Sequence, residues 1–126
     1  MATNNTKGSI NRFEDLEIWK EGMRVSVKIY ELLQKCNDYG LKDQMQRAAV
    51  SIPSNIAEGF ERQTNKEFIQ FLYIAKGSCG ELRTQLYLAT ELKIITNEHF
   101  TIILPQLIQL SSMIANFIKT RKTNFK

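Results

Sequence analysis

Apolar residues recur at steps of three and four along nearly the whole chain, and this period limits the fold more than any other feature of the sequence. Such spacing places apolar side chains along one side of an α-helix, whereas a strand needs alternation of apolar and polar residues. No segment shows sustained alternation, so we expect no sheet. The sequence predicts an all-α fold, an up-down-up-down antiparallel bundle of four helices, each about 22 residues long and joined by short loops.

The expected helices follow from these apolar lines and from the turn residues between them. They cover residues 15–36, 41–62, 64–93 and 96 onward. Thr64 and Glu67 have the spacing of a capping box at the start of the third helix. Gly77 and Gly80 lie inside that helix, where each costs about 1 kcal/mol relative to alanine. We therefore expect them to permit a close approach between helices. Pro105 either kinks the fourth helix, which we favour, or begins its main portion after a short first turn.

The first helix carries two apolar lines. The line that we predict as the core stripe is Leu16, Trp19, Met23, Val27, Tyr30 and Leu33. The second line is Ile18, Val25, Ile29 and Leu32. Together they form a wider apolar arc than a contact between two layers needs.

The second helix combines an interior proline with a row of polar residues. Residues 51–59 read Ser-Ile-Pro-Ser-Asn-Ile-Ala-Glu-Gly, and we expect Pro53 to bend the helix at a cost of about 3 kcal/mol. Polar residues on this helix and on the third have matching spacing. They predict a structural hydrogen-bond network of Arg47, Ser51, Asn55, Glu58, Ser78 and Glu81, with Gln85 at the next turn. A subunit interface or a ligand site built from the same groups are the alternatives.

The net charge of +4 is concentrated at the C-terminus. Residues 13–118 hold eleven basic and thirteen acidic residues, a net charge of −2. Basic residues at four-residue steps on the first helix give a second cluster. The candidates for contact with nucleic-acid phosphate are Lys20, Arg24, Lys28, Lys119, Arg121 and Lys122. The alternative for both clusters is a solvated surface.

No pattern in the sequence points to catalysis. His99 is the single histidine, so the Glu-x-x-His motif of bundle di-iron sites is absent, as are a glycine-rich phosphate loop and a supported Ser/His/Asp combination. We expect no catalytic residue, no metal and no cofactor. Cys36 and Cys79 have neither metal-site spacing nor the density of a secreted scaffold, which favours reduced packing residues in a cytoplasmic protein.

The chain is expected to form a single domain. Residues 1–12 are expected to be a flexible segment, 13–118 the bundle and 119–126 a basic tail. The first ten residues lack the apolar stretch of a signal peptide. No run of about eighteen uncharged apolar residues is present, so we expect no membrane partner.

Four strings occur in an order and at separations that resemble one family. They are residues 13–19, 46–59, 68–78 and 81–86, and the segment 51–59 is the most specific. The chain resembles the four-helix-bundle family encoded by intervening sequences in bacterial 23S ribosomal RNA genes. That family includes the accessory variability determinant of diversity-generating retroelements. The resemblance spans about residues 13–118.

The resemblance implies a protomer that assembles into a ring, a homopentamer with a central channel. In retroelement relatives the channel is basic, and the protein binds nucleic acid and the reverse transcriptase. We therefore expect a non-enzymatic scaffold that binds RNA or DNA through phosphate, or that binds a nucleic-acid-processing partner such as a reverse transcriptase. A purely structural or protein-binding oligomer without nucleic-acid affinity is the alternative, and a bundle enzyme or metal protein ranks third.

Overall fold

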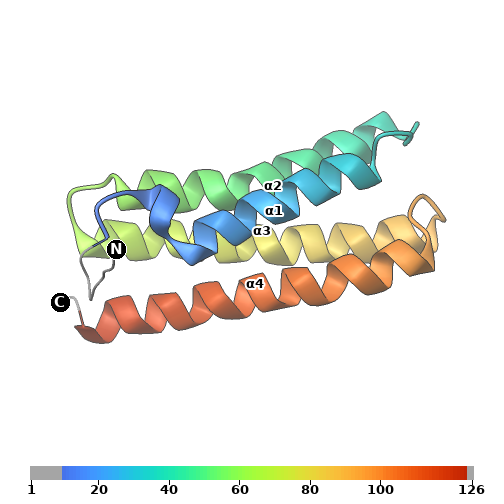
Figure 1. Ribbon diagram of the computed structural model, residues 1–126. Helices are drawn as coiled ribbons and strands as arrows, with labels where there is room; N and C mark the ends of the chain where they lie inside the picture. Colours follow the sequence, from blue (N-terminus) through green and yellow to red (C-terminus); the bar gives the residue numbers. More distant parts are fainter. Residues whose placement is uncertain (1–9, 125–126) are drawn as a thin grey trace.

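The computed structural model describes residues 10–124, and these residues form only helices and connections, without a strand (Figure 1). A single 3-10 turn precedes four α-helices. The elements are η1 (Phe13–Asp15), α1 (Glu17–Leu32), α2 (Tyr39–Phe60), α3 (Asn65–Glu91) and α4 (Asn97–Asn124). The prediction of an all-α chain with four helices is confirmed.

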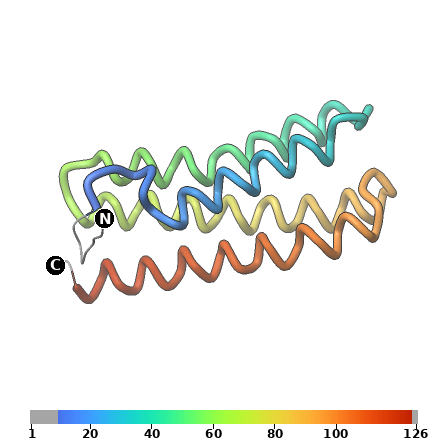
Figure 2. The backbone as a smooth tube through the Cα atoms, in the orientation of Figure 1, coloured from blue at the N-terminus to red at the C-terminus, as the bar shows by residue number. Residues whose placement is uncertain are grey.

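Consecutive helices run side by side in opposite directions along one long axis (Figure 2). α1 contacts α2 and α4, and α3 contacts α2 and α4, so α1 and α3 stand at opposite corners of the bundle. The loop between α2 and α3 lies at the same end of the bundle as η1 and the end of α4. Surfaces on α1 and on α3 therefore face different directions.

All four helices contribute to one apolar core. Its largest fully buried side chains include Ile29, Met45, Leu72, Leu82 and Leu110. At the end of the bundle that holds η1, aromatic rings form a continuous row. The row runs from Trp19 through Phe13, Phe60 and Phe68 to Phe117, with ring centroids 5.5, 6.5, 5.8 and 5.8 Å apart. This row connects η1 with all four helices.

The core stripe predicted for α1 is wrong in its middle. Met23, Val27 and Tyr30 are 41%, 54% and 46% exposed, whereas Val25 and Ile29 of the second line are fully buried. Ile18 is buried, and so are Leu16 and Leu33 at the two ends of the predicted stripe. The second line therefore faces the core, and the middle of the first line faces outward.

Small residues explain which side of α1 is buried. A Cβ atom on Gly22 would lie 3.4 Å from side-chain atoms of Ile52 and Pro53, which is van der Waals contact. One turn later, the Ser26 hydroxyl donates to the Ala49 carbonyl at 3.0 Å. Both contacts hold α1 close to α2 and turn the second apolar line into the core.

The close approach predicted for Gly77 and Gly80 is not made between the helices of this chain. No atom lies within 4 Å of a Cβ placed on either glycine. Gly59 is the tight position instead, because a Cβ there would lie 2.6 Å from Phe71 Cβ. Gly59 thus allows α2 and α3 to meet at their shared end.

Helix ends agree with the sequence in some places and differ in others. The Thr64 cap is confirmed, since its hydroxyl oxygen accepts the Glu67 N–H at 3.1 Å. The first helix is shorter than predicted, and α2 starts earlier, because Asp38 caps it by accepting the Leu41 N–H at 3.1 Å. α2 and α4 both continue through their prolines, Pro53 and Pro105.

The predicted division into segments also changes. α4 continues to Asn124, so Lys119, Arg121 and Lys122 belong to its last turns and not to a tail. At the other end, Arg12 lies 3.7 Å from the carboxylate of Asp15 in η1. Residues 1–9 of the predicted flexible segment and residues 125–126 of the predicted tail lie outside the described residues.

By length and composition, α4 would also suit a membrane span. Core helices of bundles meet the same criterion. The apolar residues Ile103, Leu107, Leu110, Ile114 and Ile118 point into the bundle core. These five residues account for part of the apolar composition of α4, whereas Ile102 is 61% exposed.

Candidate functional site

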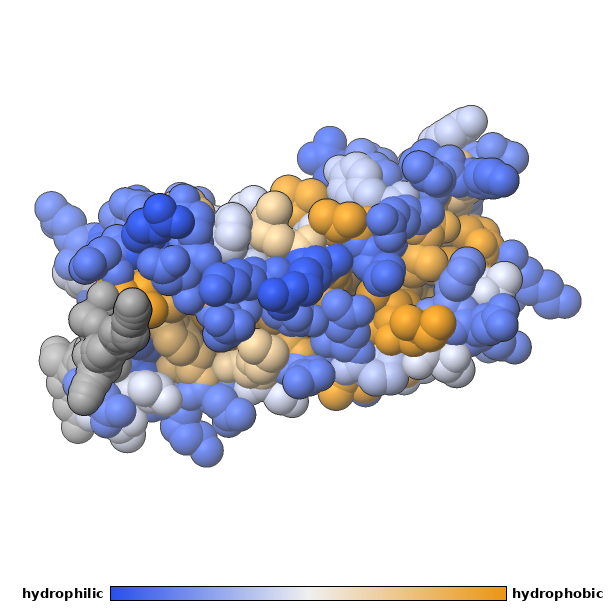
Figure 3. Space-filling model, in the orientation of Figure 1, coloured by the Kyte–Doolittle hydropathy of each residue, from blue (hydrophilic) through white to orange (hydrophobic). Residues whose placement is uncertain are grey.

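A groove with a mostly apolar lining lies between α1 and α2. It has a volume of about 610 Å³. Its apolar lining residues are Trp19, Met23, Val27, Tyr30, Val50, Pro53 and Ala57. Glu31 is the one charged residue among the described residues that line it. We call this feature the α1–α2 groove, and in Figure 3 apolar surface appears over these two helices between hydrophilic patches.

The sequence indicated the side of this groove that α1 forms. The excess apolar width of the first helix was the signal, although we assigned the wrong line to the core. Val50 and Ala57 carried no signal of their own, since neither continues the three- and four-residue spacing of the buried Ala49, Ile52 and Ile56. Their contribution depends on the way α1 and α2 pack.

A second apolar surface lies on the outer side of α3. It consists of Tyr73, Ile74, Tyr87 and Leu88, each about half exposed, with Gly77 and Gly80 between the two pairs. We call these six residues the α3 ridge. Tyr87 also packs against Phe100 of α4, with ring centroids 5.2 Å apart. The ridge is therefore held in place by the bundle while remaining open to the outside.

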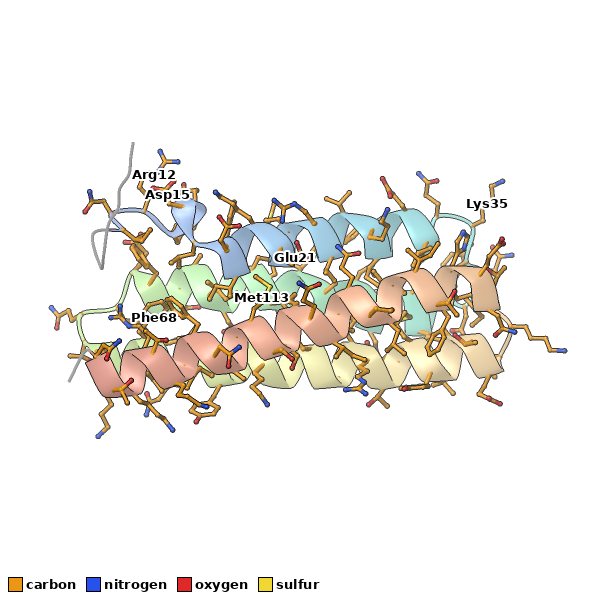
Figure 4. The ribbon with its side chains drawn as sticks, turned by 60° about the horizontal axis from the view of Figure 1, so that its bottom comes forward. Arg12, Asp15, Glu21, Lys35, Phe68 and Met113 are labelled. Carbon is orange, nitrogen blue, oxygen red and sulfur yellow. The ribbon has the colours of Figure 1, made fainter. Side chains whose placement is uncertain are left out.

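The basic stripe predicted on α1 is largely neutralised within that helix. Arg24 donates to Glu21 at 2.7 Å, and Lys20 donates to Glu17 at 3.4 Å. Glu21 points toward α4, where it accepts a hydrogen bond from Gln106 at 3.0 Å (Figure 4). Lys28 is exposed. Of the three predicted residues, two are thus paired with carboxylates on the same helix.

The basic residues at the end of α4 contact α3. The Arg121 guanidinium donates to Asn65 Oδ1 at 2.7 Å and lies 5.0 Å from the centre of the Phe68 ring. Partial burial lowers the pKa of Arg121 from its usual value. Lys122 donates to the Tyr73 hydroxyl at 2.7 Å, and Lys119 is exposed. These residues attach α4 to α3 and keep positive charge at one end of the bundle.

The predicted polar network exists in a smaller form. The Ser51 and Ser78 hydroxyls are hydrogen-bonded to each other across α2 and α3. Each hydroxyl oxygen also lies within hydrogen-bond distance of a carbonyl of its own helix, Ser51 of Ala48 at 3.0 Å and Ser78 of Ile74 at 3.2 Å. Asn55 donates to the Ser51 carbonyl at 2.7 Å. Three of the six predicted residues are therefore brought together.

The other three predicted residues lie outside this network. Arg47 pairs with Asp43 at 2.9 Å and is exposed, and Glu58 lies 3.8 Å from Arg62. Glu81 is exposed on α3. Arg47 and Glu58 share the side of α2 that carries Ser51, but their long side chains reach solvent, where each meets a charged partner. Buried Gln85 is beside the network, and its Oε1 has no hydrogen-bond partner among the described residues.

The described residues contain no group of three or more His, Cys, Asp and Glu side chains that could hold a metal ion. His99 is exposed near the start of α4. Burial raises the pKa of the Cys79 thiol to about 12, so this thiol stays protonated near neutral pH. Cys36 is half-buried and lies beside the Asp38 carbonyl.

A family model described as "23S rRNA-intervening sequence protein" matches residues 14–116, which is most of the chain. The chain belongs to this family. The match includes the groove on α1 and α2, the α3 ridge and the serine pair. It stops before the basic residues at the end of α4.

The chain is also similar to a solved structure from this family. That structure is a protein of unknown function from the S23 ribosomal protein family of Bacteroides thetaiotaomicron, with 25% sequence identity and a TM-score of 0.77. The similarity covers 82% of this chain and 99% of the other. No curated protein matches the sequence.

Proposed function

We propose that the protein is a non-enzymatic scaffold that assembles from several copies of itself, as a ring-shaped homopentamer. The observation that carries this proposal is the apolar surface left open on the folded protomer, above all the α1–α2 groove of about 610 Å³. Contiguous exposed apolar patches of several hundred Å² are typical of interaction sites. The resemblance to family members that form rings supports the number of copies.

Molar mass in solution tests this proposal. Light scattering on the purified chain should give a mass near five times the 14.6 kDa of one chain. A concentration series should show one stable species, because a large apolar interface dissociates only at high dilution. A mass equal to one chain at every concentration would overturn the proposal.

We further propose that the assembled scaffold contacts the phosphate groups of RNA or DNA through the basic end of α4. Lys119 and Lys122 lie there together, and neither has a carboxylate partner among its described contacts. Each copy in an assembly adds the same cations, which increases the number of phosphate contacts. A nucleic-acid-processing protein such as a reverse transcriptase is the partner class that the resemblance adds.

Binding of a labelled oligonucleotide at several salt concentrations tests this second part. Affinity should fall as salt rises, and it should fall further in a Lys119→Glu/Lys122→Glu variant. The matched control is Lys20→Glu/Arg24→Glu, which changes the charge equally at a site where carboxylates already pair with the cations. No retention at low salt would favour the alternative, a purely structural or protein-binding oligomer.

A further inference from the structure

We propose that the α3 ridge of one copy of the chain docks into the α1–α2 groove of a second copy. This inference rests on the proposed self-assembly and names the two surfaces that meet. Because the groove and the ridge are different surfaces, the contact is head-to-tail, and each pair leaves one groove and one ridge open. A closed ring covers both surfaces on every copy.

The shape of the groove requires a convex partner. Two identical grooves placed face to face would leave unfilled space, and apolar atoms that line a void lose their packing contacts. The ridge projects from α3, which stands at the opposite corner of the bundle from α1. A second copy can therefore present its ridge while its own groove remains accessible.

The two surfaces have similar lengths. Along the first helix the groove extends from Trp19 to Gln34, fifteen steps that span about 22 Å. On α3 the ridge extends from Tyr73 to Leu88, fifteen residues that span about 22 Å. One helix of this length can lie along the groove.

The ridge glycines have no packing role within the protomer. Each costs about 1 kcal/mol relative to alanine inside a helix. No atom of the protomer lies within 4 Å of a Cβ on Gly77 or Gly80. A backbone without side chains lets another helix approach closely, and the apolar Val27, which lines the groove and is 54% exposed, lies on a helix that borders the groove.

The size and charge of the surfaces also suit an interface core. Half-exposed side chains such as Tyr30 and Tyr87 leave roughly 100 Å² each, so each surface offers a few hundred Å². A stable interface takes about 800 Å² from each partner, of which the outer part is a polar rim. None of the six ridge residues is charged, but the exposed Glu81 lies between Ile74 and Leu88 on the same side of α3. Glu31 is the one charged residue among the described groove residues.

Charge-bearing variants test the pairing directly. Val27→Glu alters the groove and Leu88→Glu alters the ridge, and both residues are about half exposed, so the protomer should keep its helical circular dichroism. Each variant alone should give the mass of one chain. An equal mixture should form a two-chain species of twice 14.6 kDa, because one intact groove then meets one intact ridge.

The control is Ile102→Glu, which places the same charge on an exposed apolar residue outside both surfaces. This variant should keep the mass of the unmodified chain. A monomeric unmodified chain would overturn the proposed assembly itself. If the unmodified chain assembles but Val27→Glu or Leu88→Glu also keeps that mass, only the pairing is wrong. Two monomeric variants that form no pair on mixing would likewise overturn the head-to-tail contact.

Gly77→Leu provides a test that does not depend on charge. A Cβ at this position meets no side chain or neighbouring helix within 4 Å, and leucine favours a helix more than glycine does. The variant should therefore raise the thermal midpoint of the single chain while it weakens assembly. A Gly77→Leu chain that assembles as strongly as the unmodified chain would contradict the ridge as the docking element.

Discussion

The two sides of α1 are both apolar, yet only one of them is buried within the protomer. On one side, Val25 and Ile29 are fully buried, while on the other Val27 and Tyr30 are about half exposed. The difference lies in the small residues beside the buried line. Gly22 contacts α2 closely and Ser26 bonds to its backbone, so α2 covers that side of the helix. Small residues, more than apolar ones, show which side meets a neighbour.

Substitutions on the two sides of α1 should have very different effects on the protomer. Ile29→Ala should lower the free energy of unfolding by about 2–5 kcal/mol, because it leaves a cavity in the core. Tyr30→Ser should change it far less, because Tyr30 is 46% exposed. Urea denaturation at concentrations where the chain is monomeric measures both. Equal changes in the free energy of unfolding would show that the two sides of α1 are not buried to different extents.

Two glycines, one packed between helices and one on the outer surface of α3, should also differ in how substitution changes stability. Gly59→Ala should lower the free energy of unfolding by about 1–3 kcal/mol, since the new Cβ would lie 2.6 Å from Phe71 Cβ. Gly77→Ala should raise it by about 1 kcal/mol, because alanine favours the helix and meets no neighbour. Thermal unfolding of the two variants, at a concentration where the chain is monomeric, measures both changes in stability. Destabilisation by Gly77→Ala would indicate a contact within the protomer.

Much of the fold could be predicted from the sequence, because helical period and caps act locally. Thr64 and Glu67 are three residues apart, and their hydrogen bond depends on nothing else in the chain. The choice between two apolar lines is different, since it depends on how neighbouring helices pack. The α1–α2 groove could not be located for the same reason: it exists only once Val50 of α2 lies beside Val27 of α1.

The polar row of α2 also contains one residue that contacts a neighbouring helix and one that faces solvent, and their substitutions should differ by a smaller amount. Ser51→Ala should lower the free energy of unfolding by about 1 kcal/mol, because Ser78 loses its partner across the helices. Arg47→Ala should leave stability unchanged, since Arg47 is exposed and bonds only to Asp43 among its described contacts. A double-mutant cycle with Ser78→Ala isolates the serine pair. A coupling energy near zero would exclude the pair from the bundle's stability.

Lys93 is an exposed residue whose substitution should still change stability, because its backbone is strained. It follows α3 with a φ of 61°, in the left-handed region that glycine adopts freely. The next amide, Ile94 N–H, donates to the Ala89 carbonyl at 2.8 Å, so the conformation closes the helix. Lys93→Gly should therefore raise the free energy of unfolding by about 1 kcal/mol.

Lys93→Ala is the matched control, because it removes the side chain but keeps the strained backbone. Urea denaturation should show no gain in the free energy of unfolding for this variant. A gain of equal size in both variants would assign the effect to the lysine charge and not to the backbone.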